Sequence, residues 1–134
     1  MKGFTLTEVV IAIGVLAIAI LTTVFSIINL QDLNELSREK VAAVTDAVRV
    51  LEAMRDQANL SPANLQSTNW TTWANTNVIA AKGGNEVHLN QENVTAAFPA
   101  GTANPVTLTL TVHWQHKQRS YSYPVVTQMT DRSG

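Results

Sequence analysis

The chain begins with a long run of hydrophobic residues, which is followed by a periodic pattern of apolar and polar residues. No charged residue lies between Val9 and Gln31, a run of 23 residues. As a helix this run would be about 35 Å long, enough to cross a hydrocarbon core of about 30 Å. The pattern therefore predicts a membrane-spanning helix over residues 4–31.

A second helical pattern follows without a break. Between residues 31 and 58 there is neither proline nor glycine, and apolar side chains recur at steps of three and four. This apolar stripe consists of Leu33, Leu36, Val41, Val44, Val48, Leu51 and Met54. The spacing predicts that residues 32–58 continue the helix as an amphipathic segment, which ends at Asn59–Pro62.

The rest of the chain, residues 59–134, carries signals for turns and short strands. Residues 59–77 are polar, which predicts a loop with one helical turn at 62–66. Strands are predicted at 78–81, 86–89, 94–98, 106–114 and 119–127. Pro124 suits an edge strand or a bulge.

The predicted strand at 106–114 alternates most clearly, with apolar residues on one face and threonines on the other. A sheet with one apolar face needs a cover on that side, and the amphipathic helix supplies it. The expected fold is α+β, a long N-terminal helix packed against a small antiparallel sheet.

Composition narrows the classes of function. The formal net charge is −1, so overall charge indicates neither nucleic acid nor an acidic membrane surface. The chain has no cysteine, so no disulfide can hold residues 59–134 together. That segment is too small to bury a deep core by itself, and we expect it to rely on the helix before it.

Glu8 is the anomaly of the N-terminal stretch, because a carboxylate in or beside a span costs about 2–3 kcal/mol and marks a functional site. A cleaved secretory signal would need a longer basic start than Met1–Lys2 and an A-x-A-like site after the apolar run. A plain membrane anchor fits better. Lys2 on one side, with Asp32 and Glu35 on the other, places the C-terminal part outside the cytoplasm. This interpretation gives Glu8 no role.

The segment Gly3-Phe4-Thr5-Leu6-Thr7-Glu8, followed by the apolar run, resembles the class III signal of type IV pilins and pseudopilins. The resemblance implies that a prepilin peptidase cuts between Gly3 and Phe4 and methylates the new N-terminal Phe4. It also implies that Glu8 pairs with the N-terminal amine of a neighbouring subunit. Two opposite charges buried in an apolar bundle are tolerated only as a pair.

The resemblance implies a division of the chain into four parts. These are a leader at 1–3, a transmembrane and filament-core helix at 4–31, an amphipathic helix at 32–58, and a small periplasmic or extracellular antiparallel β domain at 59–134. Many relatives carry a proline midway along the apolar helix, whereas this chain has none before Pro62. We therefore expect a more continuous first half of the helix.

A weaker similarity links the strand at 106–114 and the helix end at Glu52–Arg55 to the minor pilin V and pseudopilin I groups. The implied function is that of a structural subunit, a minor one, of a type IV pilus-like filament. Its implied partners are other pilin or pseudopilin subunits, the prepilin peptidase and the bacterial inner membrane. There it would be single-pass with a periplasmic C-terminal domain before it enters a periplasmic or cell-surface filament. The alternatives are a pseudopilin of a type II secretion system and a single-span membrane-anchored periplasmic binding module.

Catalytic and metal-binding chemistry finds little support in the sequence. No nucleophile has a recognisable base partner, and no glycine motif could cradle a phosphate. His88, His113 and His116 have neither cysteines nor nearby carboxylates that complete a metal site. We expect no enzyme activity, no metal and no cofactor.

Two further groups of side chains invite an interaction role. Trp70 and Trp73, three residues apart, either plug the junction of helix and sheet or form a partner-binding patch. Lys117, Arg119 and Arg132 form a small basic group near the last hairpin. Because three acids lie in the same part of the chain, this group is only a weak signal for DNA binding.

Overall fold

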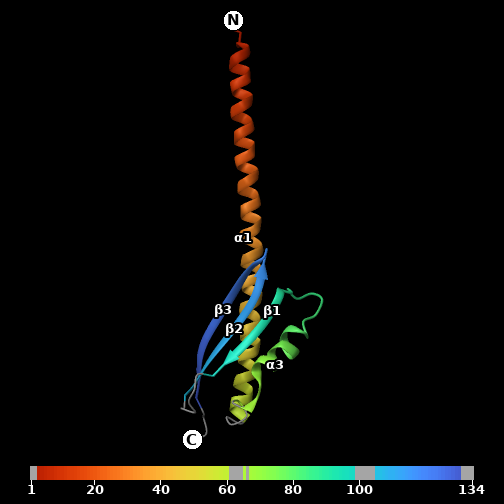
Figure 1. The fold of residues 1–134 in the computed structure, drawn as a ribbon, viewed down its shortest axis with the longest axis vertical. Helices are drawn as coiled ribbons and strands as arrows, with labels where there is room; N and C mark the ends of the chain where they lie inside the picture. Colours follow the sequence, from red (N-terminus) through yellow and green to blue (C-terminus); the bar gives the residue numbers. More distant parts are fainter. Residues whose placement is uncertain (1–2, 61–64, 66, 99–104, 131–134) are drawn as a thin grey trace. The chain divides into compact units, whose positions relative to one another are not determined.

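The computed structural model describes residues 3–60, 65, 67–98 and 105–130 and has an α+β architecture (Figure 1). Its elements are α1 (Leu6–Leu60), α3 (Trp70–Ala74), a π-helix η1 (Asn75–Ile79), and strands β1 (Asn90–Ala97), β2 (Val106–His116) and β3 (Arg119–Met129). The chain divides into two compact units, Met1–Ser37 and Arg38–Gly134, with the boundary inside α1. The prediction of a long N-terminal helix and a small antiparallel sheet is confirmed.

The first unit contains the apolar part of α1. Helix α1 continues without interruption past Gly14, which confirms the predicted continuity of its first half. The hydroxyl groups of Thr22 and Thr23 both donate to the carbonyl of Ala19, at 2.9 and 2.8 Å, so these polar side chains are satisfied within the helix. By length and composition, α1 could cross a membrane.

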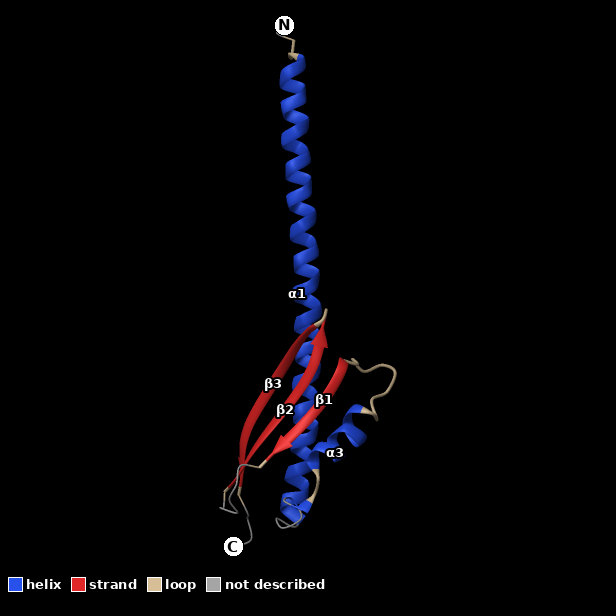
Figure 2. Cartoon of the chain, in the orientation of Figure 1, coloured by secondary structure: helices blue, strands red, loops and turns tan. Residues whose placement is uncertain are grey.

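The second unit contains the sheet, which is a simple antiparallel meander in the order β1-β2-β3 (Figure 2). Strands β2 and β3 are joined by Lys117 and Gln118, whose φ values of 46° and 65° are typical of the two-residue turns that match strand twist. The predicted strands at 106–114 and 119–127 are confirmed, with longer bounds, and the one at 94–98 corresponds to β1, which begins at Asn90 and ends at Ala97. Pro124 lies on β3, an edge strand, as predicted.

Two predicted strands and part of a predicted loop are wrong. Residues 78–79 belong to η1, 80–81 form a turn, and 86–89 have no regular structure. Residues 70–77, expected in a loop, are helical because Asn69 caps α3 by accepting from the Thr72 N–H at 3.1 Å. Trp70, Ala74 and Val78 then bury one face at four-residue spacing. The helical turn expected at 62–66 lies outside the described residues except for Leu65.

The core of the second unit joins residues 38–60 of α1 to the apolar face of the sheet. The buried helix residues are Ala43, Ala47, Val50, Leu51 and Met54, and those of β2 are Leu108, Leu110, Val112 and Trp114. The predicted stripe was therefore only partly right. Val41 and Val48 are 64% and 45% exposed, because two alanines that carry little weight in a hydropathy pattern occupy the buried face instead.

The outer edge of β1 is closed by side chains from the short helices. The Asn75 amide donates to the Val94 carbonyl at 2.8 Å and accepts from the Val94 N–H at 3.0 Å, as a neighbouring strand would. The Thr71 hydroxyl accepts from the Ala96 N–H at 3.0 Å. Two side chains thus satisfy an edge that would otherwise offer free backbone groups to another chain.

Candidate functional site

The predicted assembly residue Glu8 begins the helix as half of a capping box. Its Oε2 accepts hydrogen bonds from the N–H and the hydroxyl of Thr5, both at 3.0 Å. The Glu8 N–H donates back to the Thr5 hydroxyl at 3.3 Å. The reciprocal pattern satisfies backbone donors that the first helical turn leaves unpaired.

This capping box leaves part of the Glu8 carboxylate available. Both contacts from Thr5 use Oε2, and within the described part of the chain nothing donates to Oε1. An ionised carboxylate has roughly four acceptor positions. A positive group from outside the chain could therefore bind Glu8 without displacing Thr5.

The residues around the predicted cleavage point are open to solvent. Phe4 is 86% exposed, and a side-chain carbon built on Gly3 would meet no atom within 4 Å. A shallow groove of about 410 Å³ follows this end of the helix. It is lined by Phe4, Glu8, Val9, Ala12, Ile13 and Leu16. A cut between residues 3 and 4 would leave both capping residues in place.

The tryptophan pair belongs to the core. Trp70 is 4% exposed, and its indole N–H donates to the Leu65 carbonyl at 2.7 Å. Trp73 is partly buried against the core, with its ring centroid 5.2 Å from that of Trp70 in an edge-to-face contact. This burial fits the alternative of a plug at the helix–sheet junction, and the partner patch stays a prediction.

The histidines lie apart, and the described residues contain no group of three side chains suited to a metal ion. His88 and His113 are exposed, near the Gly83 carbonyl and the Thr95 hydroxyl respectively, each at 3.3 Å. Among the basic residues, Lys117 and Arg119 lie at the β2–β3 turn. Arg132 lies outside the described residues.

A carboxylate on α1 anchors the turn end of the hairpin. Glu39 accepts from the Trp114 indole N–H at 3.0 Å, and its other oxygen lies 2.9 Å from Nδ1 of His116. Tyr121 stacks on Trp114, with ring centroids 5.7 Å apart. No local pattern in the sequence predicts this contact, because more than 70 residues separate the partners.

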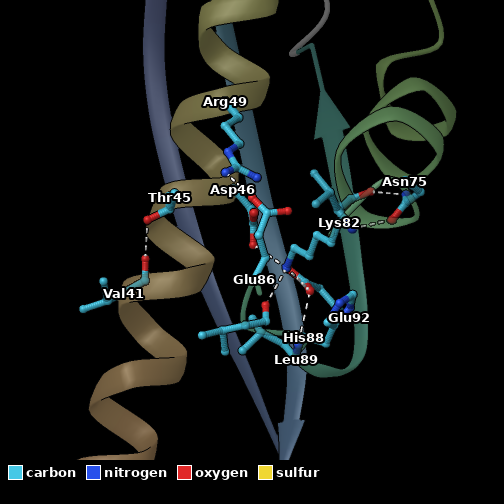
Figure 3. A network of polar contacts seen from close by, with 12 residues as sticks. Val41, Thr45, Asp46, Arg49, Asn75, Lys82, Glu86, His88, Leu89 and Glu92 are labelled. Atoms are coloured by element: carbon cyan, nitrogen blue, oxygen red, sulfur yellow. Dashed lines mark hydrogen bonds and ion pairs between the residues drawn. The ribbon is translucent and has the colours of Figure 1, made fainter. Parts of the chain in front are cut away.

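A buried ionic cluster, also unforeseen, connects α1, the segment after η1, and β1 (Figure 3). Lys82 extends toward Asp46 and Glu92, with Nζ 2.7 Å from Asp46 Oδ2 and 2.6 Å from Glu92 Oε2. The three side chains are only 2–3% exposed. Nζ also donates to the Val87 carbonyl at 3.2 Å.

The cluster holds two carboxyl groups for one amine, and this affects protonation. Burial raises the pKa of Glu92 above its ordinary value of 4.5; Lys82 opposes the shift and Asp46 adds to it. Outside the cluster, Arg49 pairs with Glu86 and lowers the pKa of that carboxyl, assisted by the Gly83 N–H. Burial thus favours the protonated form of Glu92, whereas the pairing with Arg49 favours the charged form of Glu86.

One of these features could have been read from the sequence. Thr5-x-x-Glu8 directly before an apolar run is the pattern of a capping box. The Lys82 cluster leaves no such trace, since its members come from three separate segments. The chain matches no family model, no curated protein and no solved structure.

Proposed function

We propose that the chain is a structural subunit, a minor one, of a type IV pilus-like filament. In this proposal a prepilin peptidase cuts between Gly3 and Phe4 and methylates Phe4. The subunit waits in the bacterial inner membrane with residues 32–134 in the periplasm. It then joins other pilin or pseudopilin subunits through residues 4–31 in a periplasmic or cell-surface filament.

The observation that carries the proposal is that the apolar part of α1 is exposed along its length and has one carboxylate, Glu8, at its start. Every residue from 3 to 31 is exposed. Full burial of one large apolar side chain is worth about 1.5–3 kcal/mol, so this surface needs lipid or other helices around it. Lipid alone would cover the apolar residues, but it would leave Glu8 without a positive partner.

A neighbouring subunit can supply that partner. The amine created at Phe4 by processing is a positive charge carried on an apolar helix. If it met Glu8 Oε1 of the adjacent subunit, both charges would be neutralised while Thr5 kept Oε2. A subunit inserted one step out of register would leave both charges unpaired, which costs several kcal/mol in an apolar bundle. The pairing would therefore set the axial step of the filament.

Glu8→Gln tests this role separately from helix capping. Glutamine also serves in a capping box, so the variant keeps the cap and loses the charge. We expect the processed subunit to accumulate in the membrane and its content in sheared filaments to fall at least tenfold. Glu35→Gln, the same substitution on an exposed glutamate beyond the span, is the matched control. Assembly of Glu8→Gln at the level of this control would refute the charge-pairing mechanism.

The pseudopilin of a type II secretion system is the closest alternative. It shares the processing and the Glu8 pairing, and differs in the length and place of the filament. The third candidate, a membrane-anchored binding module, depended on an exposed tryptophan patch, and burial of Trp70 weakens that basis.

A further inference from the structure

The Lys82 cluster contains one more carboxyl group than an ion pair requires. One amine is enclosed with two carboxyl groups, and all three side chains are at least 97% buried. Oδ2 of Asp46 and Oε1 of Glu92 are buried and accept no hydrogen bond from the described residues. Unsatisfied carboxyl oxygens of this kind are costly, so the arrangement calls for a chemical explanation.

The geometry distinguishes the two carboxyl groups. Lys82 donates a hydrogen bond to Glu92 Oε2 at 2.6 Å. Its Nζ lies just as close to Asp46 Oδ2, at 2.7 Å, yet this contact lacks hydrogen-bond geometry. Since a carboxyl C–O bond adds only about 1.2 Å, the Asp46 Cγ is within about 4 Å of Nζ. Reacting atoms in a near-attack arrangement are about 3–3.5 Å apart.

We propose that Lys82 and Asp46 condense to an intramolecular amide bond, with Glu92 as the catalytic proton carrier. The bond joins Nζ of Lys82 to Cγ of Asp46. It would link α1 covalently to the segment that leads into β1. This inference does not depend on the proposed function, because it concerns only the second unit of the chain.

The reaction needs no additional reagent. A proton passes from the Lys82 ammonium to the Asp46 carboxylate, so that a neutral amine faces a protonated Asp46 while Glu92 stays ionised. The Nζ lone pair attacks Cγ, Glu92 takes the proton released from nitrogen, and it returns a proton to the departing hydroxyl oxygen. The C–N bond forms, one C–O bond breaks and one water leaves, with no change of oxidation state.

The surroundings favour each of these steps. Burial disfavours the charged forms of amine and carboxyl alike, and it raises the pKa of Glu92, which makes its carboxylate a stronger base toward the proton on nitrogen. Ala43, Ala47 and Val50 on α1 and Leu89 before β1 belong to the adjoining core and exclude water. A fixed arrangement of reactants can replace a very high concentration of either one.

Such a bond would also provide a covalent cross-link in a chain that cannot form a disulfide. The chain has no cysteine, so no disulfide can link the helix to the sheet. A covalent link between residues 46 and 82 restricts the unfolded chain as a disulfide of that span would. Unlike a disulfide, an amide bond would also resist reduction.

The test is the intact mass of the full-length chain, purified in detergent and then denatured. We expect a mass lower by one water than that of the same mature chain without the link. In a tryptic digest, residues 41–49 should be joined to residues 56–117, with no cleavage at Lys82. An intact mass without loss of water would overturn the proposal.

Three variants test the roles of the residues. Lys82→Arg keeps a cation in place but should give the unlinked mass. Asp46→Asn should form the same amide with loss of ammonia instead of water, which identifies Asp46 as the acyl partner. Glu92→Gln should leave the chain unlinked, with circular dichroism to show that it is folded. A link from Lys82 to residue 92, or full linkage in Glu92→Gln, would contradict the assigned roles.

Discussion

Asn75 offers a stability test of the way the short helices close the sheet. Its side chain makes two hydrogen bonds with the backbone of Val94, at 2.8 and 3.0 Å, and one with the Thr71 carbonyl at 2.7 Å. Val94 is fully buried, so water cannot readily replace a lost partner. Asn75→Ala removes both partners of Val94 together.

The expected cost follows from these contacts. Each buried backbone group left unsatisfied costs about 1–3 kcal/mol, so Asn75→Ala, which leaves two such groups, should lower the free energy of unfolding by roughly 2–6 kcal/mol. For a domain of this size, the melting temperature should fall by about 10 °C or more. Thermal unfolding of the full chain in detergent, followed by circular dichroism of the sheet, measures this change.

Asn77→Ala is the matched control, because this asparagine is exposed and, among the described residues, its side chain donates only to the Trp73 carbonyl four residues earlier. We expect it to cost no more than about 0.5 kcal/mol. Asn75→Asp should be destabilising at neutral pH, since a carboxylate would face the carbonyls of Val94 and Thr71. Part of the loss should be recovered in acid, where the carboxyl can donate. Equal melting temperatures for Asn75→Ala and Asn77→Ala would refute the reasoning.

Four other predictions concern the same domain. The pKa of Glu92 is raised in the folded chain. Its contribution to stability is therefore full below about pH 4.5 and is lost as pH rises through its native pKa. In Glu92→Gln, the melting temperature should fall less over this pH range. The pKa of Glu86 is lowered, so its contribution is present above about pH 4.5 and is lost on acidification, and Glu86→Gln should remove this small opposite trend. Glu39→Ala leaves the buried Trp114 N–H without its acceptor and should cost about 1–3 kcal/mol, whereas Glu39→Gln should keep most of the stability because it retains an acceptor. Gln118→Gly should raise the stability by roughly 1 kcal/mol in urea unfolding, because φ at this position is 65°; no increase would show that the turn is unstrained.

The elements that local patterns define were predictable from the sequence. The uncharged run at the start predicts a helix and the strict alternation over 106–114 predicts a strand, and both elements are present. The helix α3 and the π-helix η1 were missed because half of their residues are asparagine or threonine, which favour turns in isolation. Burial of Trp70, Ala74 and Val78 overrides that preference, and only the folded core reveals it.

Of the candidate site residues, those near the N-terminus could be predicted from the sequence, and those of the Lys82 cluster could not. Glu8 stands out because a charge beside an apolar run is visible in the sequence. Its cap partner Thr5 could have been recognised from the spacing alone. The contacts of Asp46 with Lys82 and of Lys82 with Glu92 arise from tertiary packing. A solvated lysine after a helix looks the same in sequence as one that is 2% exposed.

The mature N-terminus tests the account of the filament subunit most directly. Mass spectrometry of the chain isolated from the membrane of a bacterium that has a prepilin peptidase should find a chain that begins at Phe4 and carries one methyl group on its amine. The same chain produced without the peptidase should begin at Met1. An intact Met1 in the presence of the active peptidase would contradict the proposed function, and would leave a simple membrane anchor as the explanation for residues 4–31.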